Sequence, residues 1–189
     1  MPPKIKISKE DIIKTAIELI EKEGMAAVNA RSIACELGCS TQPVFSNFAG
    51  MEELQQAVIA TAYGQYLGFL ESEVRTGAYA PYKAFGMAYI RFAKERRELF
   101  KLLFMRDRRG ESLAPTDDFT ASVDMIMQAN GVSRQTAERM HMEMWAFVHG
   151  IATMLATSFF MPEREMISDM LSDVYQGLLA RHKSEEGSK

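Results

Sequence analysis

This sequence of 189 residues lacks the features of a secreted, membrane-spanning or broadly basic protein. No run of about 18 apolar residues occurs, so we expect no membrane span. The start, Met1-Pro-Pro-Lys-Ile-Lys-Ile7, has no apolar signal core, which argues against secretion. Two cysteines, Cys35 and Cys39, are too few for a disulfide framework and fit a reducing cytoplasm. Because the formal net charge is −3, any contact with nucleic acid has to come from a local patch.

Motifs of enzyme chemistry are missing as well. The histidines His141, His149 and His182 have no metal-ligand spacing with the cysteines. We find no Ser–His–Asp order, glycine-rich phosphate loop or pair of catalytic carboxylates. We therefore expect no enzyme, no metal site and no cofactor. The chain does contain 14 methionines, flexible side chains that are common in adaptable cores and binding surfaces.

Apolar residues recur at helical spacing along almost the whole chain, and no hairpin signal interrupts them. The pattern predicts an all-α fold of about nine helices. Their expected ranges are about 8–23, 30–37, 42–47, 51–75, 82–94, 98–105, 116–129, 133–160 and 163–181. The signals at their ends are caps at Ser8, Asn29, Thr116 and Ser133, stops at Gly24 and Asn130-Gly131, and Pro162 at the start of the last helix.

Residues 30–48 carry the most specific pattern, which is that of two short helices joined by a tight turn. Gly38 can adopt the left-handed backbone that ends the first helix sharply, and Ala34 is small where the helices cross. Apolar side chains at Ile33, Leu37, Val44 and Phe48 lock the pair. Ser40 or Thr41 then caps a second helix that can enter the major groove of DNA with its first turn. We expect a helix-turn-helix domain over residues 1–50, a helical domain over 51–183 and a flexible tail over 184–189.

Residues 8–54 resemble the DNA-binding domain of the TetR/AcrR family of bacterial transcriptional regulators. The shared pattern is a helix before the helix-turn-helix, then Phe45 and Phe48, then Glu52-Glu53-Leu54. The segment from Tyr89 to Phe104 also resembles this family. Trp145-Ala-Phe-Val-His149-Gly150 is similar to a Trp…His-Gly signature of one branch of its ligand-binding domains.

The resemblance implies a homodimer that binds a palindromic double-stranded DNA operator. Each subunit would place one recognition helix in successive major grooves, and the helices at 133–160 and 163–181 would form the dimer interface. A small-molecule effector would bind among the C-terminal helices and change the spacing of the two reading heads, which are the helix-turn-helix domains (residues 1–50) of the two subunits. Repression of transcription is the activity typical of the family.

The resemblance also implies which residues contact DNA. Arg31 would bind a phosphate, and Thr41 and Gln42 would reach base edges, where Gln pairs with adenine. Pro43 would either pack on a thymine methyl group or shape the first turn of the helix. The full predicted set is Lys4, Lys6, Arg31, Ser40, Thr41, Gln42, Pro43, Phe45, Ser46 and Asn47.

The sequence departs from the family in ways that weaken contact with phosphates. Phe45 stands where relatives usually have a tyrosine that bonds phosphate, so we expect it to pack rather than touch DNA. Relatives often have lysine at Ala49 and Met51. Residues 1–50 hold six basic and six acidic side chains, so the reading head is neutral and its binding is weak or strongly salt-dependent. Lys4, Lys6 and Lys9 form an arm that either follows the DNA backbone or is a solvated tail.

A pocket for a flat or apolar effector is predicted from the aromatic and methionine side chains of the C-terminal helices. Trp145 and His149 are four residues apart and share a helix face, so they either line a pocket or form a buried, satisfied pair. Plain core packing is the alternative for each residue. The predicted ligand contacts are Phe92, Phe104, Met144, Trp145, Phe147 and His149. We expect Arg91, Arg96, Arg97, Arg106, Arg108 and Arg109 to lie at solvated helix ends and in loops.

Three hypotheses follow. The first is a ligand-responsive DNA-binding repressor. The second is a helical small-molecule-binding or interaction protein with weakened DNA binding, which the neutral reading head favours. The third is an enzyme that uses His149 as an acid or base. Cys35 and Cys39 are interpreted either as a redox switch or, as we expect, as small buried side chains.

Overall fold

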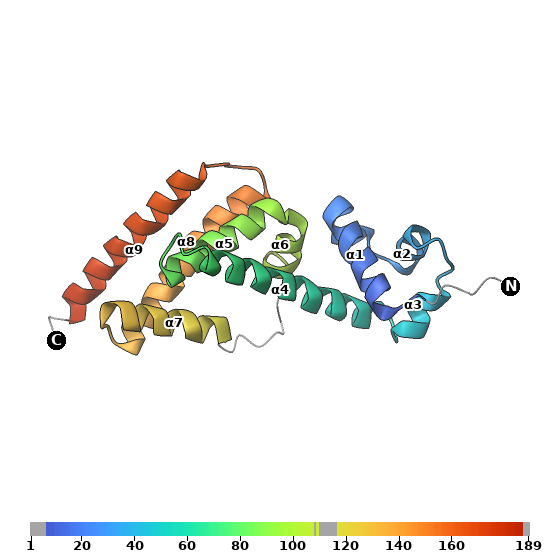
Figure 1. Cartoon of the computed structure of the whole chain (residues 1–189), viewed down its shortest axis with the longest axis horizontal. Helices are drawn as coiled ribbons and strands as arrows, with labels where there is room; N and C mark the ends of the chain where they lie inside the picture. The colour runs from blue at the N-terminus through green and yellow to red at the C-terminus, as the bar shows by residue number, and fades with distance from the viewer. Residues whose placement is uncertain (1–6, 108, 110–116, 187–189) are drawn as a thin grey trace. The chain divides into compact units, whose positions relative to one another are not determined.

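The computed structural model describes residues 7–107, 109 and 117–186 (Figure 1). Over these residues the chain forms nine α-helices and one short 3-10 turn, and no strand. This confirms the all-α prediction. The helices are α1 (Lys9–Glu23), α2 (Ala30–Glu36), α3 (Gln42–Asn47), α4 (Met51–Arg75), α5 (Pro81–Glu95), α6 (Arg97–Phe104), α7 (Asp117–Asn130), α8 (Arg134–Ala156) and α9 (Arg164–Glu186). None of the helices in the described ranges is long and apolar enough to cross a membrane.

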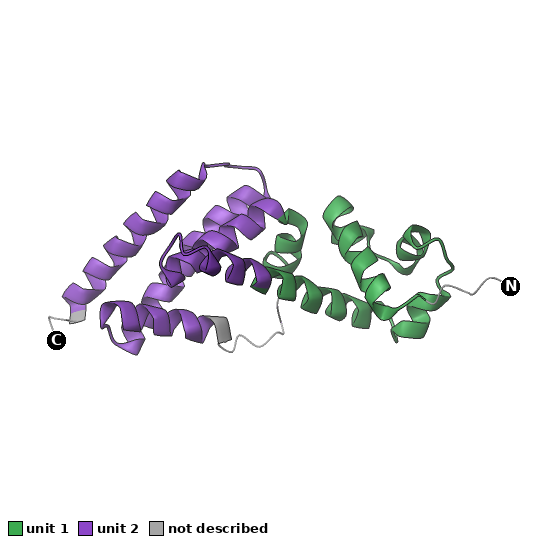
Figure 2. Ribbon diagram, in the orientation of Figure 1, with its two compact units in different colours: residues 1–67, 96–106 green, residues 68–95, 107–189 purple. Residues whose placement is uncertain are grey.

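The helices belong to two compact units that do not follow the order of the chain (Figure 2). Unit 1 comprises residues 1–67 and 96–106, and unit 2 comprises residues 68–95 and 107–189. Helix α4 therefore contributes its first part to unit 1 and its last turns to unit 2. Helix α6 belongs to unit 1, although it follows α5 of unit 2 in the sequence.

Unit 1 is held together by well-capped short helices around an apolar centre. The Ser8 hydroxyl accepts a hydrogen bond from the Asp11 amide, and the Asp11 carboxylate accepts one from the Ser8 amide. Asn29 caps α2 in the same way, together with Ser32. Each such cap stabilises a helix by about 1 kcal/mol. The buried apolar residues of this unit include Ile12, Ala16, Ile20, Ile33, Ala34, Val44, Phe48, Leu54, Val58, Leu99 and Phe100.

The turn between α2 and α3 has the left-handed glycine that the sequence predicts. Gly38 has a φ of 62°, its amide donates to the Cys35 carbonyl at 3.1 Å, and the Cys39 amide donates to the Ala34 carbonyl at 2.9 Å. This pair of bonds is a Schellman motif, which satisfies the last carbonyls of α2. Thr41 occupies the cap position of α3, but its side chain makes no capping hydrogen bond. The prediction of a hydroxyl cap there is therefore wrong.

In unit 2, helices α5, α7 and α9 pack against the buried face of α8. That face comprises Met140, Met144, Val148, Ile151 and Leu155. Helix α5 lies against α8 and approaches α9 closely, since a Cβ atom on Gly86 would come within 2.9 Å of Leu171. Small residues on α5 thus allow the tight packing of this bundle.

Three predicted helix boundaries are wrong, and one of them is the end of α9, which lies at Glu186 rather than near residue 181. Helix α8 ends at Ala156 rather than near Phe160, because Ser158 takes a φ of 56° and the Phe159 amide bonds the Met154 carbonyl at 2.9 Å. This is again a Schellman closure, here with serine in the place of glycine. Pro162 does not start α9, because the first helical bond runs from the Ile167 amide to the Glu163 carbonyl. Thr116 lies outside the described residues.

Glu73 is the most notable polar residue of unit 2, because its side chain is only 1% exposed. One carboxylate oxygen accepts from Arg91 of α5 at 2.6 Å, and the other accepts from Arg164 at the start of α9 at 2.5 Å. Both guanidinium groups also lie near aromatic rings, Arg91 over Phe69 and Arg164 over Tyr79. This cluster fixes the end of α4 to α5 and α9.

Replacing Glu73 with Gln tests this cluster. The substitution keeps the shape of the side chain but leaves two arginines without their shared counterion, so we expect the free energy of unfolding to fall by roughly 2–4 kcal/mol. The matched control is Glu71→Gln on the same helix, where the carboxylate pairs with Arg75 but is 70% exposed. For the control, chemical denaturation should show that the free energy of unfolding changes by less than about 0.5 kcal/mol. Equal effects of the two substitutions would contradict the assignment.

A second prediction concerns Gly38. A Cβ atom there would meet nothing within 4 Å, so replacement by Ala costs only the left-handed backbone conformation. We expect Gly38→Ala to lower stability by about 1–2 kcal/mol. Gly38→Asn should restore part of this stability, because asparagine tolerates the left-handed region. Thermal unfolding of the three proteins would measure both effects, and an unchanged midpoint for Gly38→Ala would rule out the backbone argument.

Candidate DNA-binding surface and effector region

Helix α3 presents one face to the core and the opposite face to solvent. Val44 and Phe48 are buried, at 1% and 2% exposure. Gln42, Phe45 and Ser46 are exposed, and their spacing of three and four residues places them on one side of the helix. The outer face of the second helix of the helix-turn-helix is thus defined by these three side chains.

Phe45 does not pack as we expected. Its side chain is 55% exposed, whereas the buried positions of the short helix α3 are taken by Val44 and Phe48. A helical residue one position beyond Val44 points about 100° away from it, so Phe45 cannot share the same core. The prediction of a packing role is wrong, and the outer face of α3 carries an uncovered aromatic ring.

The hydrogen-bond donors of the remaining α3 residues are largely directed within the helix. The Ser46 hydroxyl donates to the Gln42 carbonyl at 2.9 Å, and the Asn47 amide donates to the Pro43 carbonyl at 2.8 Å. Pro43 is half-buried and has no amide hydrogen. The side-chain amide of Gln42 is therefore the principal hydrogen-bonding group on the outer face of α3.

The other predicted DNA contacts differ in their exposure, and two of them lie outside the residues that the structure describes. Arg31, the second residue of α2, is exposed, and so is Ser40 before α3. Thr41 is half-buried. Lys4 and Lys6 lie outside the described residues.

Lys9 is not part of a free basic arm. It is the first residue of α1, its ammonium group lies 2.9 Å from a Glu53 carboxylate oxygen, and it sits 4.6 Å from the centre of the Phe48 ring. The Ala49 amide also donates to Glu53 at 2.7 Å, and this bond together with that of Lys9 lowers the pKa of the Glu53 carboxyl. The positive charge of Lys9 thus serves to join α1 to the start of α4.

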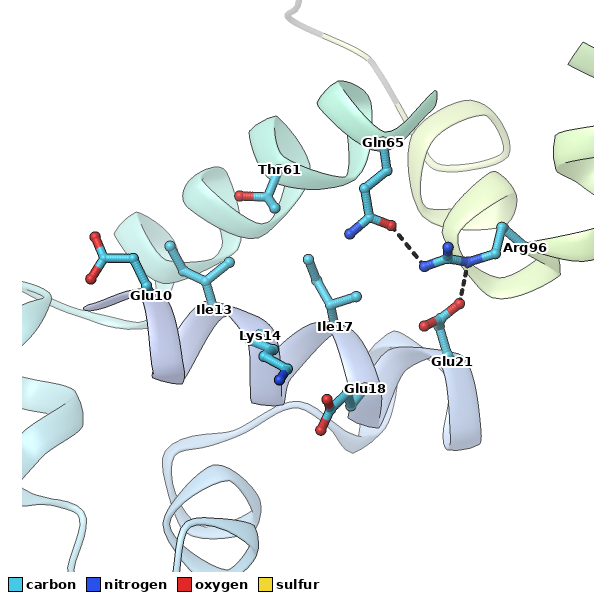
Figure 3. Close-up of a pocket in the computed structure, with 9 residues that line it drawn as sticks. All are labelled: Glu10, Ile13, Lys14, Ile17, Glu18, Glu21, Thr61, Gln65 and Arg96. Carbon is cyan, nitrogen blue, oxygen red and sulfur yellow. Dashed lines mark hydrogen bonds and ion pairs between the residues drawn. The ribbon is translucent and has the colours of Figure 1, made fainter. Parts of the chain in front are cut away.

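A groove of about 350 Å³ runs between α1 and α4 within unit 1 (Figure 3). Ile13 and Ile17 of α1 face Thr61 and Gln65 of α4 across it. Arg96 closes one end, because its guanidinium group donates to Glu21 and, at 2.7 Å, to Gln65. The expectation that Arg96 and Arg91 are merely solvated is therefore wrong, since both join helices of their own unit. The lining comprises Glu10, Ile13, Lys14, Ile17, Glu18, Glu21, Thr61, Gln65 and Arg96.

The two cysteines are not the small buried side chains that we expected. Cys35 is exposed and Cys39 is half-exposed, with its sulfur 3.2 Å from the Ser40 carbonyl oxygen. Helix α2 buries Ile33 and Ala34 instead, and Cys35 lies on its outer side. Among the residues that the structure describes, no three His, Cys, Asp or Glu side chains are grouped to hold a metal ion.

The predicted ligand contacts lie partly in the core and partly on the surface of unit 2, and one of them belongs to unit 1. Phe92 and Met144 are buried, and the Phe92 ring packs edge-on against Phe69 with centroids 5.2 Å apart. Phe147 is half-buried. Phe104 belongs to unit 1, where it packs against the rings of Tyr66 and Phe100.

Trp145 and His149 do share a face of α8, but they are not a buried pair. Their rings stack with an interplanar angle of 11° and a centroid separation of 5.2 Å, and Trp145 is 47% exposed. A hydrogen bond of 2.9 Å joins His149 Nδ1 to the hydroxyl of Tyr89 on α5. Partial burial lowers the pKa of His149, which favours the neutral ring at pH 7.

A second tyrosine–histidine pair was not predicted from the sequence. His141 Nδ1 lies 3.0 Å from the hydroxyl of Tyr82, whose pKa is raised by burial. The Tyr175 hydroxyl accepts from Asn130 at 2.6 Å beside this pair. The signal was present, because the tyrosines are seven residues apart on α5 and the histidines eight apart on α8, which is about two helical turns in each case.

Two protein families match the sequence of this chain. Residues 12–58 match the family described as bacterial regulatory proteins, tetR family. Residues 82–177 match the family described as tetracyclin repressor-like, C-terminal domain. The search of curated proteins found no match.

Solved structures share the fold at low sequence identity. A protein with unknown function from Rhodococcus sp. RHA1 is 23% identical, with a TM-score of 0.74 over 95% of this chain and 100% of that one. A TetR-like transcriptional regulator from the same organism is 13% identical, with a TM-score of 0.70 over 95% of this chain and 98% of the other. A putative transcriptional regulator from Pseudomonas aeruginosa PAO1 is 14% identical, with a TM-score of 0.71 over 93% and 92%. The helix-turn-helix of unit 1, the helical unit 2 and the two family matches agree, and the chain belongs to the TetR family of bacterial transcriptional regulators.

Proposed function

We propose that this protein is a homodimeric DNA-binding regulator, a repressor that a small, largely apolar or aromatic effector releases from its operator. The observation that carries the proposal is the outer face of α3. Buried contacts of Ile33, Val44 and Phe48 hold the helix, and Gln42 and Phe45 project from it. A second helix held in this way can enter the major groove of B-DNA.

Dimerisation through α8 and α9 is supported by apolar side chains that the single chain leaves uncovered. Met142 on α8 and Met166 on α9 are about half exposed. Met170 and Val174 continue the stripe of Met166 along α9 at intervals of four residues. Two such helices from each of two subunits would form a four-helix interface that buries the stripe.

The effector would bind among the aromatic and methionine side chains of unit 2, which include Phe92, Met144, Trp145, Phe147 and His149. It would release DNA only if it binds one conformation of the dimer more tightly than the other. Helix α4 has residues in both units and is the continuous segment through which such a difference would be transmitted. Operator binding that is equal with and without ligand would overturn this mechanism.

A second function is favoured by the charges of residues 1–50. Residues 1–50 are neutral overall, and Lys9 is already paired with Glu53. Since lysine and arginine contacts to phosphate supply much of the affinity for DNA, a protein that binds small molecules or another protein, with weakened DNA binding, is the alternative.

Selection of bound fragments from genomic DNA with the purified full-length chain distinguishes the two functions. We expect a palindromic sequence to be recovered at low salt and at physiological salt. Light scattering of the same preparation should give the mass of a dimer. A folded dimer that recovers no specific sequence at either salt concentration would overturn the proposal and favour the alternative.

Arg31 provides a test of the DNA-binding surface. We expect Arg31→Ala to weaken the binding of DNA by a similar factor for all DNA sequences, because a phosphate contact carries no sequence information. The slope of log affinity against log salt should fall by about one for each phosphate that is no longer neutralised, so by about two per dimer. Fluorescence anisotropy with a labelled operator at several salt concentrations measures both. The control is Arg75→Ala, an arginine that is 75% exposed in unit 2, for which affinity and slope should not change. An unchanged slope for Arg31→Ala would remove this residue from the interface.

A further inference from the structure

The outer face of α3 has one aromatic ring and few hydrogen-bond donors. Phe45 is 55% exposed, while Ser46 and Asn47 donate to carbonyl groups of α3 itself. A phenyl ring has no donor for phosphate oxygens and no partner for the polar edges of guanine, cytosine or adenine. If this face enters the major groove, it therefore presents one apolar ring beside the amide of Gln42.

The major groove offers such a ring one favourable partner. Among the groups that base pairs present there, the 5-methyl group of thymine is the apolar one, and side chains such as Phe contact it. Because the reading head carries no net positive charge, attraction to phosphates contributes less here than in basic reading heads. A contact between apolar groups that excludes water then accounts for a larger share of the affinity.

Gln42 lies on the same face of α3, three residues before Phe45. Three residues correspond to a rise of about 4.5 Å along a helix, which is close to the separation of neighbouring base pairs, about 3.4 Å. A glutamine amide can bond N6 and N7 of adenine in the major groove. The two side chains are thus spaced to reach adjacent A·T pairs.

We propose that Phe45 determines operator specificity by packing on thymine methyl groups, so that each half-site carries an A·T pair opposite it, next to the pair that Gln42 reads. This inference rests on the proposed function, because it requires α3 to enter the major groove. It assigns the recognition of sequence largely to the thymine methyl group and less to hydrogen bonds.

The test replaces thymine by deoxyuridine, which removes the methyl group and leaves the base-pairing edge unchanged. Each thymine of the recovered operator is replaced in turn, at the symmetric positions of both half-sites, and affinity is measured for the wild-type protein and for Phe45→Ala. We expect one position at which the replacement weakens wild-type binding by about fourfold per methyl group, so by roughly tenfold or more per dimer. At that position Phe45→Ala should bind both DNAs equally.

Gln42→Ala is the matched control on the same helix face. It should weaken binding to the operator but retain the full response to deoxyuridine. Thermal unfolding of Phe45→Ala should be close to that of the wild type, because more than half of the Phe45 surface is exposed in the fold. A large drop in the midpoint would instead assign Phe45 to the packing of unit 1 and overturn the proposal.

The remaining outcomes separate this inference from the function on which it rests. A specific operator for which removal of thymine methyl groups has no effect, or has the same effect with Phe45→Ala, overturns the role of Phe45 and leaves the regulator intact. A folded dimer that binds no specific sequence overturns both. Loss of dimerisation in Phe45→Ala would show that the ring contacts protein rather than DNA.

Discussion

The burial of two short helices against α1 is the constraint on which the reading head depends. Helices of six and seven residues are too short to be stable alone, so α2 and α3 persist only because Ile33, Val44 and Phe48 complete a core with α1. That requirement also decides which side of α3 faces outward. The side chains that α3 presents to solvent are those that the core does not bury, and in this chain they include the ring of Phe45.

Unit 2 is stabilised by a different combination of contacts. Its long helices bury broad apolar faces, and several of its polar side chains pair with one another, as in Glu73 between two arginines and in the two tyrosine–histidine bonds between α5 and α8. Such polar contacts in a low-dielectric interior favour a single arrangement of helices over others that bury similar area. Three methionines, Met87, Met140 and Met144, lie in this interior, where flexible side chains fill the space between helices whose arrangement the polar contacts fix.

The sequence predicted the helices well where a local signal controls them. Ser8, Asn29, Ser133, Gly24 and Gly38 mark helix ends through hydrogen bonds and backbone conformations that a few neighbouring residues determine. The pairing of Arg91 with Glu73 and of Arg96 with Glu21 could not be read in the same way. It depends on which residues of distant helices meet, and spacing within a single helix does not contain that information. The Schellman closure at Ser158 was missed because serine rarely takes the conformation that glycine takes there.

Because the two units alternate along the sequence, unit 1 cannot be exchanged as one continuous segment of the chain. Helix α6 returns to unit 1 after α5, and the start of this segment meets the end of α1 through the bond between Arg96 and Glu21 and the close approach of Glu98 to Gly24. An N-terminal segment transferred by recombination from another regulator would therefore have to pack against an α6 whose side chains do not match its own. Exchange of residues 1–67 alone would leave residues 96–106 without their partners, so unit 1 of this chain is not a separable N-terminal module.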